Sequence, residues 1–215
     1  MIKKIRKIKT TNSLDLENLK ETHLSIQLSL DGFSFCVINE FSKEFIAFSS
    51  YEFQNINSTT PTKHLEFIKN IFDTEKDLLK NKYKSVSVVH TNNLVTQVPK
   101  PFFDKDNLSE YLKYSVKILD NDFITYDEIS NSEIVNIYVP FVNINNFFID
   151  IYGSFEFKHN STVLIEGLLR KHKNDEGNYM YINVNNKNLE IVVINNSKLE
   201  LYNIFNFITK EDFIY

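Results

Sequence analysis

The chain has 215 residues, a formal net charge of -4, 14% aromatic residues and a single cysteine. This apolar and aromatic content excludes a disordered chain, and the slightly acidic balance argues against nucleic acid as the partner. One cysteine cannot form an internal disulfide, and no stretch reaches the roughly 18 apolar residues of a membrane span. We therefore expect a cytoplasmic protein with one large domain or two small ones.

The first 22 residues form a basic arm in our interpretation. Five of the first ten residues are Lys or Arg. Because charged chain ends are usually solvated, we expect residues 1–22 to be a mobile arm. Two alternatives are a site for an anionic partner, such as nucleic acid or a membrane surface, and docking of the stripe Ile2, Ile5 and Ile8 as a short helix or strand.

The segment 23–53 predicts a three-stranded meander. Apolar residues alternate with polar ones up to the turn at Asp31-Gly32, which is a strong hairpin signal. A polar stretch that contains Pro61 then predicts the start of a helix. The elements expected in this first half are strands over 24–30, 33–38 and 44–50, a helix from 58 to about 82, and strands over 85–90 and 94–98. Their order is β-β-β-α-β with one further strand.

The middle of the chain predicts an inserted α/β segment at about 100–160. The best candidate boundary between the two halves is the polar stretch 171–178 with Gly177. We therefore place a first lobe at 23–177. The elements expected in its second part are a helix from 106 to 119, a hairpin of strands over 123–129 and 134–140, a helix over 143–152, a strand over 155–159 and a helix over 162–172.

A second meander over 179–207 repeats the pattern of the first one. A repeated supersecondary unit of this size indicates internal duplication. We interpret residues 178–215 as the start of a second lobe that is truncated, because the last residues have the pattern of a first helical turn. We expect a complete version to carry a crossover helix and a strand after Tyr215.

A duplicated β-β-β-α-β unit resembles the actin-like ATPase fold, also called ribonuclease-H-like. The run Leu28-Ser-Leu-Asp-Gly-Phe-Ser-Phe is similar to a bacterial family known as domain of unknown function 3822. So is the run Leu94-Val-Thr-Gln-Val-Pro99, with Phe102-Phe103 and Glu110-Tyr111-Leu112 after it. The resemblance covers about residues 20–215 and implies an α/β fold of two duplicated units, the second incomplete, with an inserted segment.

The resemblance also implies where a nucleotide would bind. In that fold the turn after the first strand of each unit carries an Asp two residues before a Gly, for Mg²⁺ and phosphate respectively. In the first copy Asp31 and Gly32 are adjacent, so that neither register satisfies the motif. In the second copy Asn183 and Asn185 hold both places. These four residues are our candidate phosphate-turn positions, and we expect both turns to be degraded.

No other pattern predicts a catalytic or metal site. The five histidines show no ligand spacing, and we interpret His90 and His159 as structural residues. Acidic residues between 104 and 128 are more typical of solvated loops and helix ends than of a metal site. The many phenylalanines predict a core, and some of them an apolar partner surface.

The sequence therefore predicts a degenerate actin-like module that binds or scaffolds a protein partner without catalysis and without a cofactor. The alternative is a divergent ATP-binding protein, in which Mg-ATP closes the lobes and switches a partner surface. Self-association into homo-oligomers stays open in both hypotheses. The step from the fold to ATP rests on analogy alone.

Overall fold

The chain forms two compact units in the computed structural model, which describes residues 2–9, 21–54, 60–119, 121–185 and 188–214. Unit 1 consists of Met1–Asn92 and Pro140–Asn160, and unit 2 consists of Asn93–Val139 and Ser161–Tyr215. This division differs from the predicted boundary near residue 177. Part of the expected inserted segment belongs to unit 1, and the helix before that boundary belongs to unit 2.

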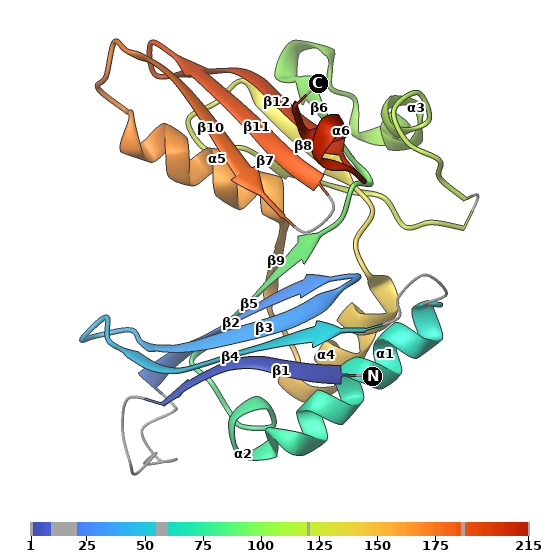
Figure 1. The fold of residues 1–215 in the computed structure, drawn as a ribbon, viewed down its shortest axis with the longest axis vertical. Helices are drawn as coiled ribbons and strands as arrows, with labels where there is room; N and C mark the ends of the chain where they lie inside the picture. Colours follow the sequence, from blue (N-terminus) through green and yellow to red (C-terminus); the bar gives the residue numbers. More distant parts are fainter. Residues whose placement is uncertain (1, 10–20, 55–59, 120, 186–187, 215) are drawn as a thin grey trace. The chain divides into compact units, whose positions relative to one another are not determined.

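Unit 1 is built on a mixed sheet with helices against it (Figure 1). Its described elements are β1 (Ile2–Lys9), β2 (Thr22–Ser29), β3 (Gly32–Asn39), β4 (Phe45–Phe53), α1 (Pro61–Thr74), α2 (Lys76–Leu79), β5 (Ser85–Thr91), α4 (Val142–Tyr152) and β9 (Glu156–His159). The strand order is β1-β4-β3-β2-β5-β9. β2, β3 and β4 form the predicted antiparallel meander, and β5 and β9 extend it in parallel.

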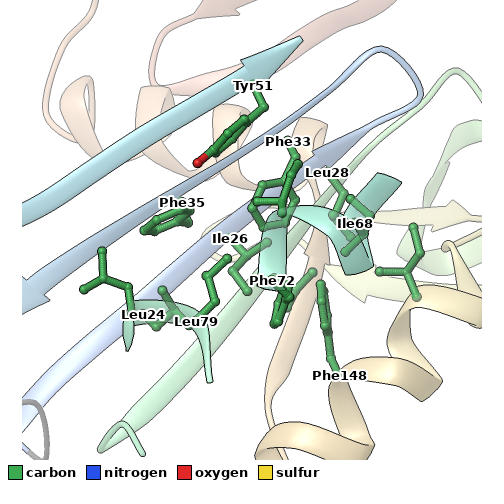
Figure 2. Close-up of a cluster of buried hydrophobic side chains, with 14 of the residues drawn as sticks. Leu24, Ile26, Leu28, Phe33, Phe35, Tyr51, Ile68, Phe72, Leu79 and Phe148 are labelled. Carbon is green, nitrogen blue, oxygen red and sulfur yellow. The ribbon is translucent and has the colours of Figure 1, made fainter. Parts of the chain in front are cut away.

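The core of unit 1 follows from the alternation of its strands. Every second residue of β2 and β3 is buried, so that Leu24, Ile26 and Leu28 share one face of the sheet. Apolar residues of α1, α2 and α4 pack against that face (Figure 2). Each such side chain contributes about 1.5–3 kcal/mol when fully buried. Thr60 accepts a hydrogen bond at the start of α1, and Pro61 occupies its first turn, as predicted.

The single helix predicted to run to about residue 82 is interrupted at Glu75. α1 ends at Thr74, and α2 begins at Lys76. The Glu75 carboxylate is buried, accepts a hydrogen bond from the Tyr51 hydroxyl at 2.6 Å and forms an ion pair with Lys4. This cluster joins the α1–α2 junction to two strands of the sheet.

The expected mobile arm is wrong for residues 2–9. They form β1, which pairs antiparallel with β4 along its length. The register shifts between Lys4 and Arg6, which marks a β-bulge and explains why the isoleucine spacing of the segment is not a plain alternation. Residues 10–20 lie outside the described part of the chain.

Unit 2 contains two small sheets, of order β6-β8-β7 and β10-β11-β12. Its described elements are β6 (Val95–Pro99), the 3-10 turns Lys100–Phe102 and Lys105–Asn107, α3 (Leu108–Leu112), β7 (Thr125–Glu128), β8 (Ile134–Tyr138), α5 (Asn160–Lys171), β10 (Asn178–Val184), β11 (Asn188–Asn195), β12 (Lys198–Asn206) and α6 (Lys210–Ile214). The helix predicted over 106–119 is shorter than expected. No helix of the described residues is both long and apolar enough to cross a membrane.

α5 joins the two small sheets of unit 2. Ile165 and Leu169 pack with Val192 and Ile194 of β11. At the start of α5, the buried Asn136 side chain donates hydrogen bonds to the hydroxyls of Ser161 and Thr162, at 2.6 and 2.8 Å. These contacts explain why α5 belongs to unit 2 although the sequence placed it before the boundary.

The other face of the β10–β12 sheet is apolar and exposed. On β10, the exposed fractions are 64% for Met180 and 54% for both Ile182 and Val184; on β12, they are 45% for Leu201 and 44% for Phe205. The strand register places Met180 across from Leu201, and Val184 across from Phe205, with one residue of β11 between each pair. Ile182 lies across from the polar Asn203 in the same way. We call this surface the outer face of the β10–β12 sheet.

We expect Glu75→Ala to lower the free energy of unfolding by about 2 kcal/mol, since it leaves the buried Tyr51 hydroxyl without its acceptor and Lys4 without its ion pair. Glu75→Gln retains an acceptor and loses less. Urea unfolding measures both. The control is Glu66→Ala on the exposed face of α1, which changes stability by less than about 0.5 kcal/mol. An equal effect of the two alanine variants would contradict the role of the Glu75 cluster.

Candidate functional site

The first candidate turn connects β2 to β3. Ser29 pairs with Gly32 across the hairpin, so Leu30 and Asp31 are the two turn residues. The predicted turn at Asp31-Gly32 is therefore wrong by one residue, and Gly32 is the first residue of β3. The Asp-Gly pattern predicted the wrong turn residues because Gly32 is required for its close contact with β4 and not for the turn.

Gly32 allows β4 to approach closely. A Cβ atom at this position would lie 2.9 Å from the backbone oxygen of Tyr51. Gly153 is the one described glycine with a positive φ, so the conformation of Gly32 does not itself demand glycine. The tight packing of two strands is what selects this residue.

The Asp31 carboxylate is hydrogen-bonded within its own turn. The Ser29 hydroxyl donates to Asp31 Oδ1 at 2.7 Å and lies 3.3 Å from the Gly32 carbonyl oxygen. The Asp31 carbonyl oxygen accepts from the Phe53 amide at 2.8 Å. The turn is thus tied both to β2 and to the end of β4.

A polar hollow of about 250 Å³ adjoins this turn. It is lined by Gln27, Ser29, Gly32, Phe33, Ser34, Ser50 and Tyr51. Its hydroxyl and amide side chains both donate and accept hydrogen bonds, so they suit oxygen-rich groups of a small ligand. The alternation that buries Leu28 in the core places Gln27 and Ser29 on the opposite side of β2.

The second candidate turn lies between β10 and β11 and is closed by side-chain amides. Asn183 donates to Glu190 at 2.6 Å, and Asn185 donates to Asn188 at 2.9 Å. The Asn185 backbone N–H also donates to the Asn188 backbone carbonyl oxygen at 2.8 Å. Both candidate side chains of this turn therefore bond to residues of the neighbouring strand β11.

Glu190 is a buried acidic residue that the sequence analysis missed. It is 3% exposed and accepts hydrogen bonds from Asn183 and from the Tyr202 hydroxyl, the latter at 2.7 Å. Burial, followed by the Glu190 charge, raises the pKa of Tyr202 above its ordinary value. The signal in the sequence was a lone charge inside the apolar run of β11.

The four candidate positions are divided between the units. Asp31 and Gly32 belong to unit 1, whereas Asn183 and Asn185 belong to unit 2. Within the described ranges, no group of three or more His, Cys, Asp or Glu side chains is arranged to hold a metal ion. The two candidate turns are therefore described separately, each by the hydrogen bonds within its own unit.

His90 and His159, which the sequence analysis interpreted as structural residues, are both buried. His159 Nε2 lies 3.0 Å from the carbonyl oxygen of Asn92, and the Phe141 amide donates to His90 Nδ1 at 3.3 Å. A third histidine, His64 on α1, is buried against the rings of Phe53 and Phe141. The sequence carried no signal that these three side chains come together.

Comparison with known proteins gives a family and a fold. Residues 11–215 match the family described as Protein of unknown function (DUF3822). No curated protein matches the chain. A crystal structure from Bacteroides thetaiotaomicron VPI-5482, described as a protein with actin-like ATPase fold and unknown function, is 26% identical to the chain. The match covers 95% of this chain and 77% of that chain, with a TM-score of 0.82.

A more distant likeness is to a chain of the PilM–PilN type IV pilus biogenesis complex. It is 11% identical, covers 89% of this chain and 63% of that chain, and has a TM-score of 0.53. At this identity the likeness shows the fold alone. The family match over nearly the whole chain agrees with the mixed α/β architecture, so this chain belongs to the DUF3822 family of proteins of unknown function and has an actin-like ATPase fold.

Proposed function

We propose that this protein is a non-catalytic module that binds a protein partner. The observation that carries the proposal is the apolar outer face of the β10–β12 sheet. Met180, Ile182 and Val184 are each more than half exposed on neighbouring positions of one strand face. Contiguous exposed apolar surface of this kind marks interaction sites.

The candidate phosphate turns support a role without catalysis. Asp31 accepts a hydrogen bond from Ser29, and Asn183 and Asn185 are bonded to β11. A Mg²⁺ site needs carboxylate oxygens that are available to the ion or its waters. Neutral amides in the second turn and a carboxylate bonded to its own turn fit that requirement poorly.

The occupant that we propose for the outer face is an amphipathic helix of the partner. In unit 1 the corresponding meander β2–β3–β4 has one apolar face, and α1 packs on it through Ile68, Ile71 and Phe72. The outer face presents aliphatic and aromatic side chains on the corresponding meander of unit 2. A helix with apolar residues at i, i+3, i+4 and i+7 is therefore its natural complement.

The fold is compatible with this role. It is also found in a chain of the PilM–PilN complex, which is an assembly of two proteins. That observation supports the proposal only as far as the fold is concerned, since function is determined by the site and not by the fold.

A second candidate function is nucleotide binding, and the polar hollow beside the Ser29–Asp31 turn favours it. Its serine hydroxyls and the Gln27 amide are groups that bind phosphate or sugar oxygens. In this hypothesis Mg-ATP switches the partner surface. The hollow and the outer face belong to different units, so the two functions are separable by mutation.

We expect the 215-residue chain to bind a fluorescent peptide of residues 60–74, which form α1 and serve as a model amphipathic helix, and we expect Ile182→Lys or Met180→Lys to weaken that binding at least tenfold. A lysine on the outer face places a charge against the apolar stripe of the helix. Fluorescence anisotropy measures the affinity.

The matched control is Ile149→Lys on α4 of unit 1. Ile149 is 50% exposed and Ile182 is 54% exposed. The two substituted side chains therefore lie in different units but are about equally exposed to solvent. Equal binding by the wild type and the Ile182→Lys variant would contradict the outer face as the docking surface. Equal losses in the Ile149→Lys and Ile182→Lys variants would indicate non-specific adsorption and contradict it as well.

We expect titration calorimetry with Mg-ATP to show no saturable heat up to millimolar nucleotide, which corresponds to a binding free energy weaker than about -4 kcal/mol. The reason is the internal bonding of Asp31, Asn183 and Asn185. Saturable micromolar binding that is lost in an Asp31→Asn variant would overturn the non-catalytic proposal in favour of nucleotide binding. Ser130→Ala, in unit 2 and outside both turns, is the control for that variant.

A further inference from the structure

The chain passes between the two units at three places, and a small set of unit 1 residues lies at all three. The crossings are after Asn92, before Pro140 and after Asn160. His90 and Asn92 lie at the first, Phe141 at the second and His159 at the third. Each of these residues is within two positions of a crossing.

Two histidines tie these crossing segments to one another. The Phe141 amide donates to His90 Nδ1 at 3.3 Å, which joins the second crossing to the first. His159 Nε2 lies 3.0 Å from the Asn92 carbonyl oxygen, which joins the third crossing to the first. His90 and His159 are also register partners on the parallel strands β5 and β9.

The first of these bonds requires a neutral imidazole. A backbone amide donates, so His90 Nδ1 must be the unprotonated nitrogen, and the ring proton is on Nε2. A second proton would go to Nδ1 and would place an N–H group against the Phe141 N–H. Phe141 is the N-cap residue of α4, so the bond that is lost holds the beginning of that helix.

The surroundings of His90 offer no compensation for a positive charge. The titratable groups that face it are His159 from β9 and His64 from α1, while α4 and its N-cap contribute Asn145 and Phe141. Among the described residues, neither His90 Nε2 nor Asn145 Oδ1 makes a hydrogen bond of normal geometry. Burial lowers the pKa of His90, and the neighbouring Asn145 side chain opposes only part of that decrease.

We propose that His90 and His159 form a proton-sensitive latch, which in its neutral state holds together the three segments of unit 1 at which the chain passes to and from unit 2. Protonation breaks the bond from Phe141 to His90 and releases the beginning of α4 from β5. The latch is independent of the proposed binding function, because its parts are remote in sequence from β10–β12 and belong to unit 1.

The direction of the pH dependence follows from burial. Burial lowers the pKa of His90 to about 4 and that of His159 to about 3, from an ordinary value of 6.5. A buried histidine with a lowered pKa stabilises the closed state to its full extent above pH 6.5, where the ring is neutral in both states. This stabilisation decreases as the pH falls from 6.5 toward the lowered pKa. The closed latch therefore weakens up to tenfold per pH unit between about pH 6.5 and the folded pKa of His90, whose bond from Phe141 requires a neutral ring.

The test is amide hydrogen exchange of Phe141 in the full chain, followed by NMR and expressed as a protection factor corrected for the intrinsic pH effect. We expect the protection of Phe141 to fall by at least tenfold between pH 7 and pH 5. The amide of Phe35 in the central strand β3 keeps its protection over the same interval. Equal losses at Phe141 and Phe35 would mean global acid unfolding and would overturn the latch.

Two variants replace the titrating groups and keep the bonds. In His90→Asn the side-chain oxygen takes the place of Nδ1 as acceptor, and in His159→Gln the side-chain amide takes the place of Nε2 as donor. We expect the protection of Phe141 to become independent of pH in His90→Asn. His172→Gln, in unit 2, leaves the pH dependence as in the wild type. A His90→Asn variant whose Phe141 protection falls as steeply as in the wild type would refute the proposal.

A measurement on the wild type alone covers the case in which His90→Asn does not fold. Imidazole nitrogen NMR reports the tautomer of His90 directly. At pH 7 we expect the proton on Nε2 and a bare Nδ1, with protonation well below pH 6. The opposite tautomer at neutral pH is incompatible with the latch.

Discussion

Burial of one face of the β2–β3–β4 meander is the constraint on which unit 1 depends. Phe72 of α1 lies between Phe33 of β3 and Phe148 of α4, with ring centroids 6.1 and 5.4 Å away. Three segments far apart in the sequence thus meet at one aromatic ring. Since α4 belongs to the second passage of the chain through unit 1, this core is complete only after the chain has returned from unit 2.

The same alternation that builds the core also creates the candidate site. In β2, leucine and isoleucine point to the helices, so the intervening Gln27 and Ser29 are left on the other side, where they line the polar hollow. The Ser29 hydroxyl bonds to Asp31 within the turn, and the Ser29 backbone hydrogen-bonds to His64, whose pKa is lowered by burial and raised in part by that bond. The turn and the buried histidines are therefore coupled through one residue of β2.

The two meanders differ in what covers them. In unit 1, α1 and α4 pack on the apolar face of the meander. The edge of β2 that does not pair with β3 pairs with β5. In unit 2, among the described residues, α5 packs on one face of the β10–β12 sheet and the outer face stays exposed. This asymmetry between otherwise similar meanders is the physical basis of the proposed partner surface.

The sequence was enough to predict most local elements, because alternation, turn residues and helix caps act within a few positions of the chain. It predicted the meanders, a crossover helix that begins in the segment around Pro61, and the actin-like fold class. It predicted a mobile arm at β1 and offered a docked strand only as an alternative, because a strand of basic residues is recognised only through its pairing with β4. The break at Glu75 was missed for a similar reason, since the buried carboxylate has its partners on β1 and β4.

The three-dimensional structure was needed to show which distant segments share a unit. β9 joins the first sheet and α5 joins the second unit, although they are consecutive in the chain. It also revealed the buried Glu190 and brought His64, His90 and His159 together from a helix and two strands. Such contacts depend on strand pairing and packing over long sequence separations, which no local pattern encodes.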